Sequence, residues 1–259
     1  IIGNGLPDGT SSVGGVVWDA AYVLVENSLI AGNIGESGGG LSAHDGALDV
    51  IGSTIAYNVA TQGGGAGINA STNLLGVENS LIWQNVASGM LHQGAQIAFP
   101  SSQDDYTISY TNVQGWNGYY GGMENFGLDP VFTDPEGPDG IPGTEDDDLR
   151  VTPDSPCINR GDPAFVPLDG ELDLDRDPRV KGCRVDVGAY ESDAGLASGD
   201  YDIDRDVDLR DFAEFQDCFR ASDVNSDGFD TCLCTFDLHE DGVIDSADYA
   251  VFWTLQIGP

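Results

Sequence analysis

The chain has 259 residues, of which 44 are acidic and nine are Lys or Arg, so its formal net charge is −35. This balance excludes direct binding to nucleic acid or to an anionic membrane surface, because both need clustered basic groups. Hydrophobic residues make up 40% of a chain with 36 Gly, which indicates a folded, turn-rich protein, and no run approaches the ~20 apolar residues of a membrane span.

Three segments of the N-terminal region repeat one another. Residues 22–33 (YVLVENSLIAGN) recur as 47–58 (ALDVIGSTIAYN) and 74–85 (LLGVENSLIWQN), and residues 106–114 are a fourth, looser copy. Apolar residues alternate within each copy, which predicts short strands separated by turns. A repeat of this length cannot bury its inward face alone, so stacked copies should form a β-solenoid. The copies align three Ser and three Asn residues, which should form side-chain ladders along the stack: Ser28, Ser53, Ser80, Asn33, Asn58 and Asn85.

A later run does not share the repeat. It comprises residues 127–135, 149–161 and 185–191. Glycine tracts precede the repeated segments at residues 14–15, 38–40 and 63–65. Together with these tracts and the Asn-Ser-Leu-Ile unit, the later run resembles the bacterial right-handed parallel β-helix repeat proteins, in which such a segment closes the helix of secreted surface proteins. The resemblance covers about residues 14–192. It implies a mainly β fold with right-handed parallel β-helix coils over residues 1–129 and a closing segment over residues 130–192, but no particular activity.

Carboxylates repeat in frame over the last 60 residues, after a linker at residues 193–199. One loop places acidic residues at positions 1, 3, 5, 7, 9 and 12, with position 7 offering its carbonyl: Asp200, Asp202, Asp204, Asp206, Asp208 and Asp211. The frame returns 37 residues later as Asp237, His239, Asp241, Val243, Asp245 and Asp248. Calcium prefers six to eight oxygen ligands, so residues 200–259 are predicted to bind Ca²⁺ in two loops.

A helix should follow each calcium loop. Phe212, Phe215 and Phe219 have helical spacing after the first, as do Tyr249, Phe252 and Leu255 after the second, and we expect these side chains to form a core. Two further acidic sets are ambiguous. A third calcium loop or an Asx-turn linker would fit Asp223, Asn225 and Asp227, and a calcium-pinned loop or a plain acidic loop would fit Asp139, Asp146 and Asp148.

A duplicated calcium loop with only the exiting helix resembles the dockerin module, over residues 199–257. The resemblance implies a small α-helical domain that binds a cohesin domain on a scaffold or cell surface. The positions that often read Ser-Thr in that family are Leu209-Arg210 and Ser246-Ala247 here, which leaves the choice of partner open. Arg205 stands where the family has Gly, and His239 where it has Asp or Asn, so the second loop should recruit water.

Five cysteines favour one or two disulfides in an exported protein. Cys157 with Cys183 would close the segment that contains them. Cys218 with Cys232 or Cys234 would join a helix to the loop after it.

The sequence offers little support for catalysis. No Lys or Arg precedes Arg150, which argues against a uronate lyase, and of the acids on the repeats only Glu26 and Glu78 align. The sequence therefore predicts a non-catalytic, extracellular calcium-binding surface or matrix protein whose partner is a cohesin-like domain or a neighbouring copy. The alternative is a carbohydrate-active protein that binds or hydrolyses polysaccharide. A head-to-tail filament is a third interpretation, because the first coil exposes Val16, Val23 and Val25 without an evident cap.

Overall fold

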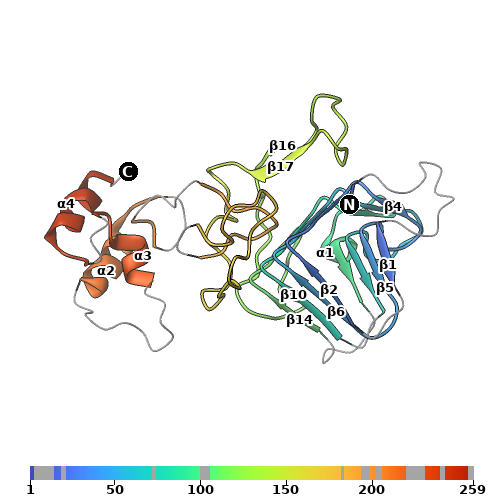
Figure 1. The fold of residues 1–259 in the computed structure, drawn as a ribbon, viewed down its shortest axis with the longest axis horizontal. Coiled ribbons are helices and arrows are strands. Elements are labelled where there is room, and N and C mark those ends of the chain that lie inside the picture. The colour runs from blue at the N-terminus through green and yellow to red at the C-terminus, as the bar shows by residue number, and fades with distance from the viewer. Residues whose placement is uncertain are drawn as a thin grey trace.

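The computed structural model describes residues 1–2, 15–18, 22–71, 74–99, 106–181, 184–193, 199–201, 206–219, 231–239 and 243–255. The fold is mainly β, with a few helices later in the chain (Figure 1). Residues 22–113 form a parallel β-solenoid of about three turns. The solenoid predicted from the repeats is therefore confirmed.

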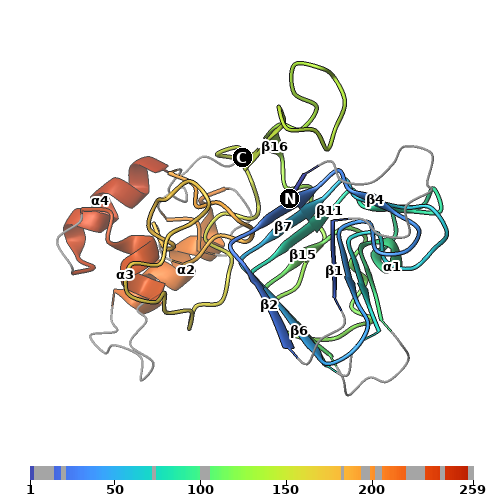
Figure 2. The ribbon, with the colours of Figure 1, turned by 45° about the vertical axis from the view of Figure 1, so that its right-hand side comes forward.

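Each of the first three coils contributes one strand to each of four parallel sheets, whose strands lie side by side in Figure 2. The first sheet contains β1 (Val16–Trp18), β5 (Leu41–Ala43), β9 (Ile68–Ala70) and β13 (Ile97–Ala98). The second contains β2 (Tyr22–Glu26), β6 (Ala47–Ile51), β10 (Leu74–Glu78) and β14 (Tyr106–Ser109). The third contains β3 (Leu29–Ala31), β7 (Thr54–Ala56), β11 (Leu81–Trp83) and β15 (Asn112–Val113), and the fourth β4 (Ile34–Gly35), β8 (Val59–Ala60) and β12 (Val86–Ala87). The looser fourth copy thus adds β14 to the second sheet and β15 to the third, β13 before it extends the first, and no described strand of this coil joins the fourth.

Inward-pointing residues of successive coils stack in columns. In β6, Leu48 and Val50 are fully buried, whereas Asp49 between them points outward. The parallel register places Leu48 beside Leu75 and Val50 beside Val77. Each such aliphatic side chain contributes about 1.5–3 kcal/mol on burial, so the stacking of coils supplies the core that one repeat lacks.

A ladder of buried amides joins the coils at the corner between the third and fourth sheets. Asn33 donates from N and Nδ2 to Asn58 Oδ1 (3.0 and 2.9 Å), and Asn58 donates likewise to Asn85 Oδ1 (3.0 and 2.9 Å). Asn85 then donates to Gln96 Oε1 at 3.1 and 2.8 Å. Asn58 Nδ2 also donates to the carbonyl of Ile30 at 2.9 Å, so the ladder satisfies corner groups that no strand pairs.

Gln96 replaces Asn at the end of this ladder. It lies in α1 (Gln93–Gln96), a short helix that the repeat pattern did not predict. A second ladder at the preceding corner links Ser28 N to Ser53 Oγ and Ser53 N to Ser80 Oγ, each at 3.2 Å. Both predicted ladders are therefore present.

The strand that the first coil contributes to the third sheet, β3, is paired on its outer edge. The terminal ammonium of Ile1 donates to the carbonyl of Leu29 at 2.7 Å, and Ile2 forms a parallel bridge with Ala31. Two residues of the chain itself thus extend this sheet, which corrects the expectation of an uncovered edge at that point.

The closing segment follows, and it contains the hairpin of β16 (Phe132–Asp134) and β17 (Asp148–Val151). It is attached to the solenoid through polar contacts: Ala189 N donates to Thr54 Oγ1 (3.0 Å) and Asp162 N donates to Asn79 Oδ1 (2.7 Å). Inside it, the buried Arg179 forms an ion pair with the buried Glu191. The two contacts with the solenoid join residues that are 135 and 83 positions apart in the chain.

Cys157 is a free, fully buried thiol, so the suggested Cys157–Cys183 disulfide was wrong at Cys157. Its Sγ accepts a hydrogen bond from Asn112 Nδ2 at 3.2 Å, and its side chain packs with Leu81 and Val187. Burial raises the pKa of this thiol to about 11, which keeps it protonated at neutral pH. Cys183 lies outside the described residues.

The described residues of the last part of the chain contain three helices: α2 (Leu209–Cys218), α3 (Thr231–Phe236) and α4 (Ser246–Leu255). Phe215, Phe236 and Phe252 are buried against one another, with ring centroids 5.0–6.0 Å apart. A disulfide joins Cys218 to Cys232, as one of the two predicted pairings. Helices α2 and α4 were predicted, whereas α3 was not.

We predict that Asn58→Ala lowers the free energy of unfolding by roughly 3 kcal/mol, because it leaves several buried donors and acceptors of two coils unpaired. Urea unfolding of the intact chain measures this change. Gln62→Ala, at an exposed position four residues later, is the control and should change stability by less than about 0.5 kcal/mol. Equal effects of the two substitutions would contradict a structural role for the ladder.

Candidate metal centre

Three carboxylates of the first predicted calcium loop converge at the start of α2. The ligand oxygens of Asp206, Asp208 and Asp211 all lie within 4.8 Å of one another, and no other such group of three occurs among the described residues. Asp208 caps the helix, and Asp211 stands in its first turn with no exposed surface. The capping position therefore brings the carboxylates together, because the chain must turn tightly where the helix begins.

Asp211 closes this loop with both of its oxygens. Oδ1 accepts a hydrogen bond from Tyr201 N at 2.7 Å, and Oδ2 accepts one from Asp208 N at 2.8 Å. Asp208 Oδ1 in turn accepts from Arg210 N at 2.7 Å. Each carboxylate oxygen has a second lone-pair direction, so these bonds still leave acceptor capacity for a cation.

The second loop has nearly the same arrangement at the start of α4. Asp248, also without exposed surface, accepts from His239 N at 2.9 Å and from Asp245 N at 2.8 Å. Asp245 Oδ1 accepts from Ala247 N at 2.7 Å, just as Asp208 does in the first loop. The two loops differ in one donor. The backbone N–H that binds the closing Asp belongs to position 2 in the first loop (Tyr201) and to position 3 in the second (His239). The sequence repeat is thus also a repeat of hydrogen bonds.

This donor set suits a hard divalent cation. Three carboxylates within 4.8 Å repel one another in the absence of a counter-charge. Oxygen ligands alone, in a loop that leads into a helix, match the preference of Ca²⁺, whereas zinc would favour His and Cys nitrogen and sulfur ligands.

The other predicted ligands are only partly within the described residues. Asp200 is buried, Asp237 is half-buried, and His239, Val243 and Asp245 are exposed. Six predicted ligands lie outside the described residues, and their involvement stays a prediction: Asp202, Asp204, Asp223, Asn225, Asp227 and Asp241.

The acidic turn of the closing segment is held by its own hydrogen bonds. Asp146 accepts from Thr144 Oγ1 at 2.5 Å and from Asp139 N at 3.2 Å, and the first of these bonds lowers the pKa of Asp146. Asp148 forms an ion pair with Arg150 at 2.9 Å. Asp139, Asp146 and Asp148 thus each take part in contacts within the segment, and they do not form a group comparable to that at α2.

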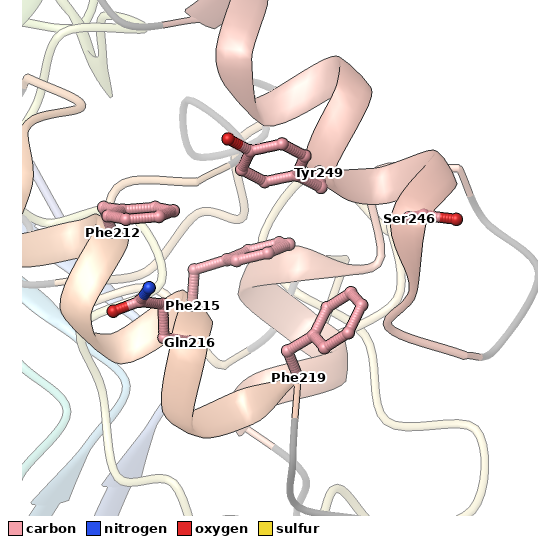
Figure 3. Close-up of a pocket in the computed structure, with 6 residues that line it drawn as sticks. All are labelled: Phe212, Phe215, Gln216, Phe219, Ser246 and Tyr249. Atoms are coloured by element: carbon pink, nitrogen blue, oxygen red, sulfur yellow. The ribbon is translucent and has the colours of Figure 1, made fainter.

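A hollow of about 360 Å³ lies between α2 and α4, on the same helices that start at the carboxylate loops. Figure 3 shows that rings from both helices face it. Phe219 and Tyr249 are 46% and 39% exposed, which corrects the expectation that the aromatic residues are all core. The sequence position of Phe219 could have indicated its exposure, because Phe219 follows the last residue of α2, where a side chain has fewer neighbours. The lining comprises Phe212, Phe215, Gln216, Phe219, Ser246 and Tyr249.

Comparison with known proteins provides no family assignment. No family model matches the chain, and no match is found among curated proteins or solved structures. None of the described helices has the length and apolar character needed to cross a bilayer. The functional proposal therefore depends on the residues of the chain itself.

We predict that Asp208→Asn and Asp245→Asn each weaken calcium binding at one loop by about tenfold or more, because each removes a ligand charge. Asn also caps helices well, so the helix start should persist. Isothermal titration calorimetry of the intact chain measures both affinities. Asp217→Asn, at an exposed position of α2, is the control. Unchanged calcium affinities in both loop variants would exclude these residues as ligands.

Proposed function

We propose that residues 200–259 form a dockerin-like, calcium-ordered attachment module of an extracellular surface or matrix protein, and that the solenoid, of right-handed coils, is the part that it attaches. The proposed function is non-catalytic in this module. Residues 200–259 contain 16 acidic residues and only three Arg. Calcium at the two loops would offset the repulsion among these negative charges.

One observation carries the proposal: the helices that begin at the two Asp-closed loops also present the aromatic hollow. Asp211 is in the first turn of α2, and Phe219 follows its last residue. A cation that fixes the start of α2 against the loop would therefore also fix the wall of the hollow. Ion binding and partner binding would be coupled through one ten-residue helix.

Exposed apolar groups indicate a protein partner for this module. Besides the hollow, Leu209 and Trp253 are 77% and 61% exposed. Trp253 adjoins the hollow, since its ring centroid lies 6.2 Å from that of Tyr249, and an exposed apolar surface of this kind is typical of interaction sites. A second copy carries the same charge of −35, so charge repulsion favours a different partner. We therefore propose a cohesin-like domain over a neighbouring copy.

We expect the immobilised intact chain to bind cohesin domains in calcium and to release them in EDTA. Phe219→Ser should weaken binding by about tenfold or more, because it removes a ring from the hollow. Surface plasmon resonance measures both effects. Val166→Ser replaces an apolar residue of the closing segment that is 81% exposed, and it should leave binding unchanged.

Sedimentation of the same proteins distinguishes the other occupant. Calcium-dependent self-association that Phe219→Ser abolishes, without cohesin binding, would identify a neighbouring copy as the partner and reject the cohesin proposal. If neither binding nor association depends on calcium, the attachment function itself is wrong.

A further inference from the structure

A second hollow lies on the outer face of the second solenoid sheet and extends to the closing segment. It measures about 500 Å³. Its floor is formed by outward positions of β6, β10 and β14, the strands that run side by side in Figure 1. Tyr110 and Met123, which follow β14, and Asp162 of the closing segment complete it. We call it the sheet groove.

Gly76 deepens the centre of the floor. It occupies the rung between Asp49 and Thr107, and a Cβ atom at Gly76 would lie 2.2 Å from Asp49 Oδ1. The absent side chain leaves room for the Asp49 carboxylate to lie across the strand. Tyr22 holds that carboxylate from the next strand, since its hydroxyl donates to Asp49 Oδ2 at 2.9 Å.

The closing segment brings Asp162 beside Glu78. Asn79, the residue after Glu78, accepts the Asp162 N–H at Oδ1 (2.7 Å), and the Glu78 and Asp162 carboxyls both line the groove. Two neighbouring carboxyls repel each other when both are ionised, which favours a proton on one of them. The Nδ2 group of Asn79 is buried without an acceptor among the described residues, so one donor at this turn remains unused.

The surroundings of Glu78 raise the pKa of its carboxyl to about 7. Burial is the largest cause, followed by the contact with Asp162 and by the negative charges of Asp162 and Asp49. Tyr110 also faces the pair. The negative charge of Glu124 raises the pKa of Tyr110, and the positive charge of Arg184 lowers it. Below about pH 7 the Glu78 carboxyl is therefore mostly protonated and offers a hydroxyl donor beside Asp162.

This chemistry favours an uncharged, hydroxyl-rich ligand. An anionic polymer would meet Asp49 and Asp162 as like charges, which disfavours uronates. A cationic peptide would form ion pairs with carboxylates. It is disfavoured because much of the groove surface is apolar and because protonation of Glu78 lowers the negative charge of the groove. Sugars present apolar CH faces to side chains such as Tyr106 and Met123, and hydroxyl edges to carboxyl groups.

We propose that the sheet groove binds a neutral glycan chain, with the neighbouring carboxyls of Glu78 and Asp162 and the carboxylate of Asp49 contacting sugar hydroxyls, and with Tyr106 and Met123 packing against sugar faces. This site is separate from the helical module, so it does not rest on the attachment function. It gives the carbohydrate alternative drawn from the sequence a specific location, as a binding site without a bond-breaking step.

Calorimetric titration of the intact chain with neutral gluco-, manno- and xylo-hexasaccharides tests this site at about pH 6 and about pH 8.5. At least one hexasaccharide should bind, and its affinity should fall about thirtyfold at the higher pH, which is the change in protonated fraction of a group with a pKa of about 7. Glu78→Gln keeps the shape and a donor, so its affinity should not vary with pH.

Glu26→Gln is the matched control, because Glu26 occupies the same outward position two coils away and does not line the groove. It should behave as the unmodified chain does. Absence of binding by all three neutral hexasaccharides at about pH 6 would overturn the proposal. Binding of oligolysine that strengthens as the pH rises and is weakened by Glu78→Gln would also overturn it, in favour of a basic peptide ligand.

Discussion

The buried amide ladder is the constraint on which the solenoid depends. Strand pairing alone would permit adjacent coils to slip by one residue, which would turn every inward side chain outward. The bonds from Asn33 to Asn58 and from Asn58 to Asn85 fix the corner of each coil against the next, because each amide must find its one partner without access to water. Aliphatic stacking supplies most of the stabilisation, and the amides set the register in which that stacking occurs.

A fixed register determines what the outer face can do. In the second sheet, Leu48 and Leu75 lie inward, so Asp49 and Gly76 must lie outward side by side. The sheet groove follows from that alternation together with one missing side chain. Its acidic partner Asp162 comes from the closing segment, whose backbone binds Asn79 at the corner between the second and third sheets. The solenoid thus positions the groove without any residue of the helical module.

The sequence was informative where interactions are local or periodic. Period-two apolar residues and the aligned Asn33, Asn58 and Asn85 predicted the coils and the ladder, since both depend only on spacing. The spacing of the first calcium loop, with Asp208 at position 9 and Asp211 at position 12, predicted the meeting of these two residues for the same reason. Contacts across unrelated segments were not predictable. Asp162 meets Asn79 across 83 residues of chain, with no shared periodicity, and Cys157 is a free thiol because the core around Asn112 encloses it.

The most informative difference among the carboxylates is how each one is neutralised. Glu191 is paired with a buried Arg179, and Asp148 and Asp175 share Arg150, so these acids have partners within the chain and serve the fold. One carboxylate oxygen from each of Asp206, Asp208 and Asp211 lies within 4.8 Å of the others, and Glu78 lies near Asp162. The repulsion within such a group of like charges is relieved when it takes up a cation or a proton. The first solution accounts for the proposed calcium loops and the second for the sheet groove, which is why two different ligands can be proposed for one strongly acidic chain.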